Sequence, residues 1–206
     1  MINYFDDDSV IFLGGTGRMK NYYKVWILLL MIGMMTGCKQ EAPSLTVLVF
    51  SDLPTTLDEN LSIMMKEQLG EESTLSLELY PVYLEKISAE LAIKRGDIFI
   101  VPEDDIINMM DPVSFTPLTE VAEELSLNSN LLENLKGMNP DTSEIELYAL
   151  PLGNDSYAIS KLGVTSKQSL VAFVPNYSKK KEESIELIKY LISGEKTKGV
   201  EERNND

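Results

Sequence analysis

The apolar positions of the chain form short runs that alternate with helical stretches, and their order predicts an α/β domain. Residues 46–50 (TVLVF) are continuously apolar, as in a strand buried on both faces. Apolar residues then recur at helical spacing until Gly70 ends the helix. Residues 75–79 alternate leucine with polar residues, as in a strand with one wetter face. A second helix at 83–94 leads to a third strand at 98–101 (IFIV).

This order of strand, helix, strand, helix and strand predicts right-handed crossovers and a mostly parallel sheet with helices on both faces. Residues 170–174 (LVAFV) predict a further strand, and an amphipathic helix is expected at 179–193. Weaker patterns lie between these parts. They indicate a short helix at 104–110, one or two helical pieces at 118–136, and strands at 145–150 and 157–162 that pair across the loop between them.

The start of the chain has the pattern of an export signal. Lys20 and Lys24 precede an apolar run of 11 residues at 25–35, and small residues follow it. A spanning helix needs about 20 apolar residues, so a plain transmembrane anchor is the less favoured alternative. Residues 1–18 carry three consecutive aspartates and fit no export signal. We therefore expect the natural protein to start at Met19, the alternative being a disordered extension.

The tetrapeptide Met35-Thr36-Gly37-Cys38 closes this signal. It resembles the lipobox of bacterial lipoprotein signal peptides, with Met35 in place of the family's usual leucine. The resemblance implies cleavage before Cys38, a diacylglycerol on its thiol, and the membrane as a partner held through this lipid anchor. Several acyl chains on one residue anchor a protein firmly. We therefore expect a lipid-anchored protein of the cell membrane that faces the outside of the cytoplasmic membrane.

The expected organisation has five parts, with a single core in the mature protein. They are a mis-assigned or disordered start at 1–18, a lipoprotein signal peptide at 19–37, a lipidated cysteine and polar tether at 38–45, an α/β domain at 46–194, and a disordered charged tail at 195–206.

Charge and composition narrow the function. Three acidic and three basic residues precede Cys38, so the whole net charge of −15 belongs to the part that follows and repels nucleic acid and anionic lipid. We therefore expect no nucleic-acid partner. The chain has no histidine, and its only cysteine is Cys38, which excludes Ser-His-Asp, Cys-His and histidine-containing zinc chemistry. Residues 103–105 are acidic but lack the alternating ligands and glycine of a calcium loop. No cofactor or metal is expected.

From Thr46 to Ser193 the chain resembles one lobe of an extracellular solute-binding protein, the receptor component of import transporters. The resemblance rests on the runs TVLVF, DIFIV, YALPL and LVAFVP, in this order, and on the lysine-rich helix that follows. It implies a small polar or cationic solute as ligand and a transporter permease as partner. Those receptors usually have two lobes and about twice this length, so the resemblance covers a single lobe without the second half of a closing cleft.

In open parallel sheets, ligands bind beyond the carboxyl ends of the strands. This rule selects polar residues after the first, third and last strands, namely Ser51, Asp52, Thr55, Thr56, Glu103, Asp104, Asp105, Asn176 and Tyr177. Their acidic and hydroxyl groups suit a cation, an amine or a sugar. The alternative is that these residues cap helices or are simply solvated. A second polar loop, Asn154 to Tyr157, is interpreted as a plain turn.

The sequence therefore predicts a non-catalytic binding or accessory lipoprotein. The alternative is a protein-interaction module that docks on a cell-envelope complex, which a large exposed apolar patch would favour. An enzyme would need two carboxylates that converge in one pocket, and no spacing singles out such a pair among the many acidic residues. The basic run at 179–181 is the solvated start of a helix or a contact with membrane or partner.

Overall fold

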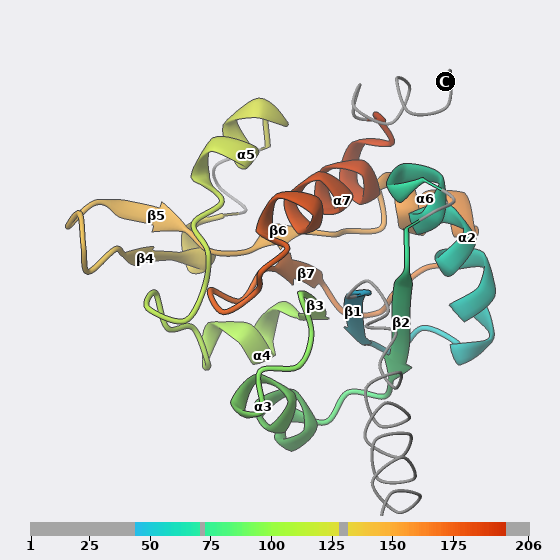
Figure 1. Ribbon diagram of the computed structural model, residues 1–206, viewed down its shortest axis with the longest axis horizontal. Helices are drawn as coiled ribbons and strands as arrows, with labels where there is room; N and C mark the ends of the chain where they lie inside the picture. Colours follow the sequence, from blue (N-terminus) through green and yellow to red (C-terminus); the bar gives the residue numbers. More distant parts are fainter. Residues whose placement is uncertain (1–43, 71–72, 128–131, 197–206) are drawn as a thin grey trace, which may run out of the picture. The chain divides into compact units, whose positions relative to one another are not determined.

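A five-stranded sheet forms the centre of the domain (Figure 1). This computed structural model describes residues 44–70, 73–127 and 132–196; the start at 1–18, the signal peptide at 19–37, Cys38 and residues 197–206 of the expected tail lie outside them. The strand order is β2-β1-β3-β7-β6. The strands are β1 (Leu45–Phe50), β2 (Leu75–Tyr80), β3 (Ile98–Pro102), β6 (Leu150–Pro151) and β7 (Leu170–Phe173).

Four of the five strands run in one direction. β1 is parallel to both of its neighbours, so Val47 lies between Leu77 of β2 and Ile98 of β3. β7 is antiparallel to β3 and to β6, and β6 therefore shares the direction of the first three strands. We call the end at which β1 and β3 finish the carboxyl end of the sheet, and the end at which they begin the amino end. β7 starts at the carboxyl end and finishes at the amino end.

One face of the sheet is covered by three helices: α2 (Asp58–Leu69), α6 (Tyr157–Leu162) and α7 (Lys181–Ser193). Val49 and Ile100 on this face line a small apolar space together with Leu61, Ile159 and Leu191 from the three helices. These side chains are almost fully buried. The continuous apolar run of β1 therefore has a partner layer on this side.

The opposite face is aromatic. Tyr80, Phe50, Phe99 and Phe173 form a row across β2, β1, β3 and β7, with successive ring centroids 5.1, 6.4 and 5.1 Å apart. The helices α3 (Leu84–Ala92) and α4 (Glu103–Ile107) lie on this side (Figure 1). Side chains from both faces of β1 are thus buried, and the expected α/β fold with helices on both faces of the sheet is confirmed. The sheet, which was expected to be mostly parallel, is mixed: four strands share one direction and β7 opposes them.

Between β3 and β6 the chain forms short elements: α5 (Thr119–Glu124), a 3-10 turn at Glu133–Leu135, and a hairpin of β4 (Lys136–Met138) and β5 (Ile145–Leu147). The expected strand at 145–150 is therefore split between β5 and β6. Its expected pairing with 157–162 is wrong, because 157–162 is the helix α6. Ala158, Ile159 and Leu162 recur at helical spacing and pack on the core, and Gly163 ends the helix in the left-handed conformation.

The described helices are short: none has the length and apolar character that crossing a bilayer requires. The domain boundary expected at residue 46 lies one residue inside the observed start of β1, and α7 ends at Ser193 as the apolar stripe predicts.

Candidate binding cleft

The loop after β1 is held by its own polar groups. The buried Ser51 accepts a hydrogen bond from the backbone N of Leu53 at 3.3 Å. The two carboxylate oxygens of Asp52 accept hydrogen bonds from Ser166 Oγ at 2.8 Å and from the backbone N of Lys167 at 3.0 Å. Burial raises the pKa of Asp52, but these hydrogen bonds outweigh it and hold the pKa below its ordinary value of 3.8. Ser51 and Asp52 thus have internal partners.

A second pair of bonds completes this clamp between loops. Asn154 Oδ1 accepts from the backbone N of Ser166 at 2.8 Å, and Asn154 Nδ2 donates to the backbone O of Ser166 at 3.1 Å. The loop after β1, the loop after β6 and the segment before β7 are therefore tied together at the carboxyl end of the sheet. We call Asp52, Asn154 and Ser166 the loop clamp.

The remaining predicted residues at this end differ in exposure. Thr55 and Thr56 are exposed on a 3-10 turn (Thr55–Leu57), and Asp104 is exposed on α4. Asp105 is half-buried, and burial together with the neighbouring Asp104 raises its pKa. One of its oxygens, Oδ2, has no hydrogen-bond partner among the described residues. Of the residues predicted at this end of the sheet, Glu103 lines a cleft.

This cleft has a volume of about 490 Å³ and opens at the carboxyl end of the sheet. Glu103 follows β3, Pro151 ends β6, and Leu170 begins the antiparallel β7, so three adjacent strands contribute to it. Its lining residues are Glu103, Ser126, Leu127, Asn134, Pro151, Gly153, Asp155, Ser156, Ser169, Leu170 and Ile192.

The lining of the cleft is acidic and hydroxyl-rich, with some apolar side chains. Both charged lining residues, Glu103 and Asp155, are acids. Three serines and Asn134 add neutral hydrogen-bonding groups, while Leu127, Leu170 and Ile192 are apolar. A small ligand pocket typically combines apolar walls with a few polar groups in this way. In the described part of the chain, no group of three or more histidine, cysteine or acidic side chains is arranged to hold a metal ion.

Sequence reasoning missed most of these residues. Asp155 and Ser156 belong to the polar loop that was interpreted as a plain turn, and the turn exists: Ser156 donates from its backbone N and its Oγ to the O of Gly153, at 3.0 and 2.6 Å. The same turn presents Asp155 to the cleft. Its place in the loop that follows a strand was the available signal. Ser126, Asn134 and Ser169 gave no signal, because only the tertiary fold brings them there.

Asn176 and Tyr177 do not lie at this end, and the expectation that they join the other predicted residues is wrong. β7 is antiparallel, so its last residues reach the amino end of the sheet. Tyr177 OH donates to the backbone O of Arg95, just before β3, at 3.0 Å. Both residues line a different groove of about 560 Å³, which Leu91, Lys94, Met109, Asp111, Val113, Ser114 and Phe115 complete.

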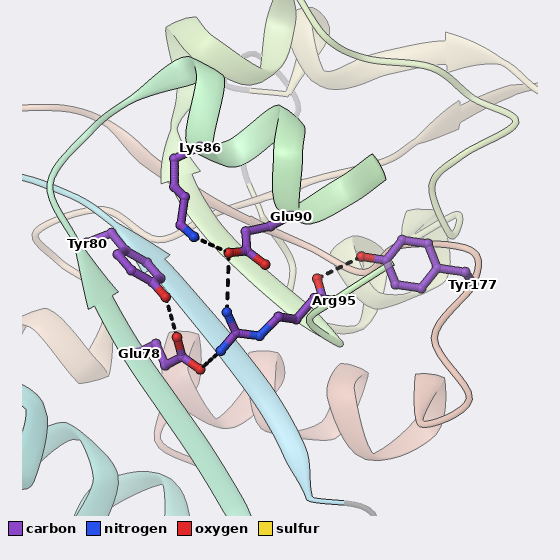
Figure 2. A network of polar contacts seen from close by, with 6 residues as sticks. All are labelled: Glu78, Tyr80, Lys86, Glu90, Arg95 and Tyr177. Atoms are coloured by element: carbon purple, nitrogen blue, oxygen red, sulfur yellow. Dashed lines mark hydrogen bonds and ion pairs between the residues drawn. The ribbon is translucent and has the colours of Figure 1, made fainter. Parts of the chain in front are cut away.

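A charged network ties α3 to the edge strand β2 (Figure 2). Glu90, nearly fully buried, pairs with Lys86 on its own helix and with Arg95 Nη1 at 3.3 Å. Arg95 also pairs with Glu78, which accepts a hydrogen bond from Tyr80 OH. Hydrogen bonding to Glu90 raises the pKa of Lys86, despite an opposing effect of desolvation. Buried charges must be paired in this way, so we assign the network a structural role.

No protein-family model matches the chain. It is 26% identical over 157 residues to the Bacillus subtilis (strain 168) protein named "Putative lipoprotein YteS", a match that covers 76% of this chain and 87% of that protein. A solved structure, the ABC substrate-binding protein Lmo0181 from Listeria monocytogenes in complex with cycloalternan, aligns with a TM-score of 0.41 and 14% identity. That alignment covers 56% of this chain and spans 29% of the other, less than a third of its length.

Proposed function

We propose that the chain is a lipoprotein matured at Cys38 and anchored outside the cytoplasmic membrane, and that its domain binds a small polar or cationic solute without transforming it. The observation that carries the binding proposal is the cleft at the carboxyl end of the sheet, whose charged lining residues are both acidic. The similarity to a protein described as a lipoprotein supports the placement. A transporter permease that receives the solute is the partner we propose.

The cleft favours ligands that donate hydrogen bonds. Glu103 and Asp155 supply carboxylate oxygens, which accept strong bonds from ammonium groups, and the serines can serve the hydroxyls of a sugar. The apolar lining residues contribute contact area for a carbon skeleton. An anionic ligand such as a phosphate would meet two like charges and find no basic residue among those that line the cleft.

The placement is tested by intact mass and membrane fractionation in a bacterial host. We expect the natural chain to yield a lipidated product that begins at Cys38 and sediments with membranes. Cys38→Ala should lose both the lipid and the new amino terminus. An unmodified product that keeps residues 1–37 would overturn the lipoprotein proposal.

Binding is tested by calorimetric titration with putrescine, as a cationic probe, and maltose, as a neutral polyhydroxyl probe. If a cation is the ligand, Glu103→Gln with Asp155→Asn should abolish putrescine binding, since both lining charges are removed. Glu85→Gln, on an exposed position of α3 on the other face, is the matched control and should bind normally. Maltose binding that survives the double substitution would assign the cleft to a neutral sugar. If the natural chain binds neither putrescine nor maltose, both ligand classes are contradicted.

A second candidate function is docking on an envelope protein, and the hairpin favours it. Met138 of β4 and Ile145 of β5 are directly paired, and they are 62% and 61% exposed. Figure 1 shows this hairpin extending from the rest of the domain. A photocrosslinker at residue 138 should capture an envelope protein if this surface docks, and the same crosslinker at residue 55 serves as the control. Equal labelling from both positions would reject a specific docking surface.

A further inference from the structure

The first strand begins at the end of the domain where the proposed tether arrives. Ser44 is the first described residue, and Leu45 opens β1 at the amino end of the sheet. The strand is fixed there, because the backbone N of Thr46 donates to Asp97 Oδ2 at 3.0 Å and the backbone N of Asp97 donates to Thr46 O at 2.8 Å. Residues 38–44 can span at most about 25 Å in extended form. A lipid on Cys38 would therefore keep this end near the bilayer.

Basic side chains gather at the same end of the sheet. Two hydrogen bonds hold the segments that carry them together: Ser178 Oγ donates to Asp97 Oδ1 at 2.7 Å, and Tyr177 OH donates to the backbone O of Arg95 at 3.0 Å (Figure 2). We call the five residues of these segments the basic end: Lys94, Arg95, Lys179, Lys180 and Lys181.

Three of the five lysine and arginine charges have no acidic partner. Arg95 pairs with Glu78 and Glu90, and Lys180 pairs with Glu183 at 3.2 Å. In contrast, Lys94 and Lys179 are exposed and make no ion pair with any described residue. The ammonium group of Lys181 donates to the neutral amide oxygen of Asn176.

Several acids lie near these lysines, and two of them are held in hydrogen bonds with neutral groups. Asp97 accepts hydrogen bonds from Thr46 and Ser178, as described above. Asp111 accepts from the backbone N of Val113 at 3.1 Å and from Ser114 Oγ at 2.7 Å. Glu182 and Glu183 are exposed at the start of α7. These acids keep their negative charge, so the basic end is close to neutral, with exposed unpaired lysines, in a chain whose net charge is −15.

Two exposed apolar side chains accompany these lysines. Ile93, next to Lys94 in the chain, is 68% exposed. Val113 is 62% exposed and lines the same groove as Lys94. Basic groups interspersed with exposed apolar side chains are the combination that binds the interface of an anionic bilayer.

We propose that the basic end docks on anionic phospholipid headgroups and orients the anchored domain, so that the cleft at the opposite end of the sheet opens away from the membrane. The inference rests on the proposed lipid anchor at Cys38. The net negative charge does not forbid the contact, because charges farther than about 8 Å from the headgroups are largely screened at physiological salt. The nearest charges then decide the orientation, and at the amino end these include Lys94, Lys179 and Lys181.

The test uses the full chain, expressed, lipidated and reconstituted in vesicles, with a bimane label at Ile93→Cys or at Thr55→Cys. Cys38 is the only natural cysteine, and the lipid blocks its thiol, so each label reports one position. Residue 55 lies at the carboxyl end of the sheet. Spin-labelled lipid should quench the label at residue 93 more than the label at residue 55 in phosphatidylglycerol vesicles, and this difference should shrink in vesicles of phosphatidylcholine alone.

Charge reversal provides the matched comparison. Lys94→Glu with Lys179→Glu should lower the docked population by at least about fivefold for each lysine reversed, because the loss of one basic residue near an anionic surface already has that effect. Lys167→Glu with Lys196→Glu makes the same charge change at exposed lysines away from the basic end and should leave the quenching unchanged. Equal quenching at residues 93 and 55, or an equal effect of both double variants, overturns the orientation while the anchor stands. Intact mass without a lipid on Cys38 overturns the anchor and the orientation together.

Discussion

At the residue scale, alanine substitutions at two helix-ending glycines distinguish the effect of backbone strain from that of a steric clash. Gly163 and Gly194 both adopt the left-handed conformation, with φ of 66° and 77°. A Cβ at Gly163 would meet nothing within 4 Å, whereas one at Gly194 would lie 2.6 Å from Cδ2 of the Tyr157 ring. We expect Gly163→Ala to lower the free energy of unfolding by about 1 to 2 kcal/mol, the left-handed penalty alone.

Gly194→Ala should be more destabilising than Gly163→Ala by a further 1 to 3 kcal/mol, roughly the usual penalty for overpacking. Tyr157 cannot withdraw freely, because its ring packs on Tyr190 with a centroid distance of 5.3 Å. Urea denaturation of both variants measures the difference. Equal losses would mean that the Tyr157 ring moves aside without a penalty.

The loop clamp gives a pH prediction at the scale of elements. Its hydrogen bonds lower the pKa of Asp52 below 3.8, so the ionised carboxylate stabilises the fold above the pKa of the unfolded chain. That stabilisation is lost as the pH falls through the folded-state pKa. Asp52→Asn replaces one of the two accepting oxygens with an NH2 group, which would face a hydrogen-bond donor of Ser166 or Lys167. The substitution should therefore destabilise the domain at neutral pH.

The expected loss at pH 7 is modest, below about 1 kcal/mol, because Asp52 is exposed and solvent screens its interactions. The difference in free energy of unfolding between Asp52→Asn and the natural chain should shrink as the pH falls below about 4. Urea midpoints across this range measure it, with Glu85→Gln as an exposed acid outside the loop clamp. A gap that does not change with pH would assign the loss to altered packing.

The secondary-structure elements also show how much of the fold the sequence could predict. Strands such as 46–50 and 98–101, and the helix that ends at Ser193, have strong apolar periods and appear as expected. The segment 157–162 is only six residues long, and its apolar residues also fit an alternating reading, so packing on α2 and α7 decided that it is helical. The hairpin of β4 and β5 is three residues per strand, too short for any period to indicate it.

At the scale of the whole molecule, strand direction limited the prediction of the site. The apolar run at 170–174 fits a buried strand of either direction, because a parallel and an antiparallel strand at this place would bury the same side chains. The antiparallel direction of β7 moved Asn176 and Tyr177 to the amino end and brought Ser169 and Leu170 to the cleft. Glu103 does lie at the carboxyl end and lines the cleft, since β3 is parallel to β1, and its contact with a ligand stays a prediction.

The charge of the whole molecule leads to a prediction about salt. A net charge of −15 opposes compaction, and salt weakens this repulsion. Salt also weakens favourable ion pairs, but those outside the α3 network are largely exposed pairs of small energy, such as Lys136 with Glu133. We therefore expect the urea midpoint to rise when sodium chloride is increased from low to physiological concentration.

Two exposed acids allow this explanation to be checked directly. Glu123 and Glu144 are exposed, and neither has an ion-pair partner among the described residues. Glu123→Gln with Glu144→Gln should therefore raise the midpoint at low salt and make it less sensitive to added salt, because both changes reduce the same repulsion. A midpoint that falls with salt would mean that local ion pairs outweigh the net charge, and the network of Glu90 and Arg95 would then be the dominant electrostatic term in the stability of the domain.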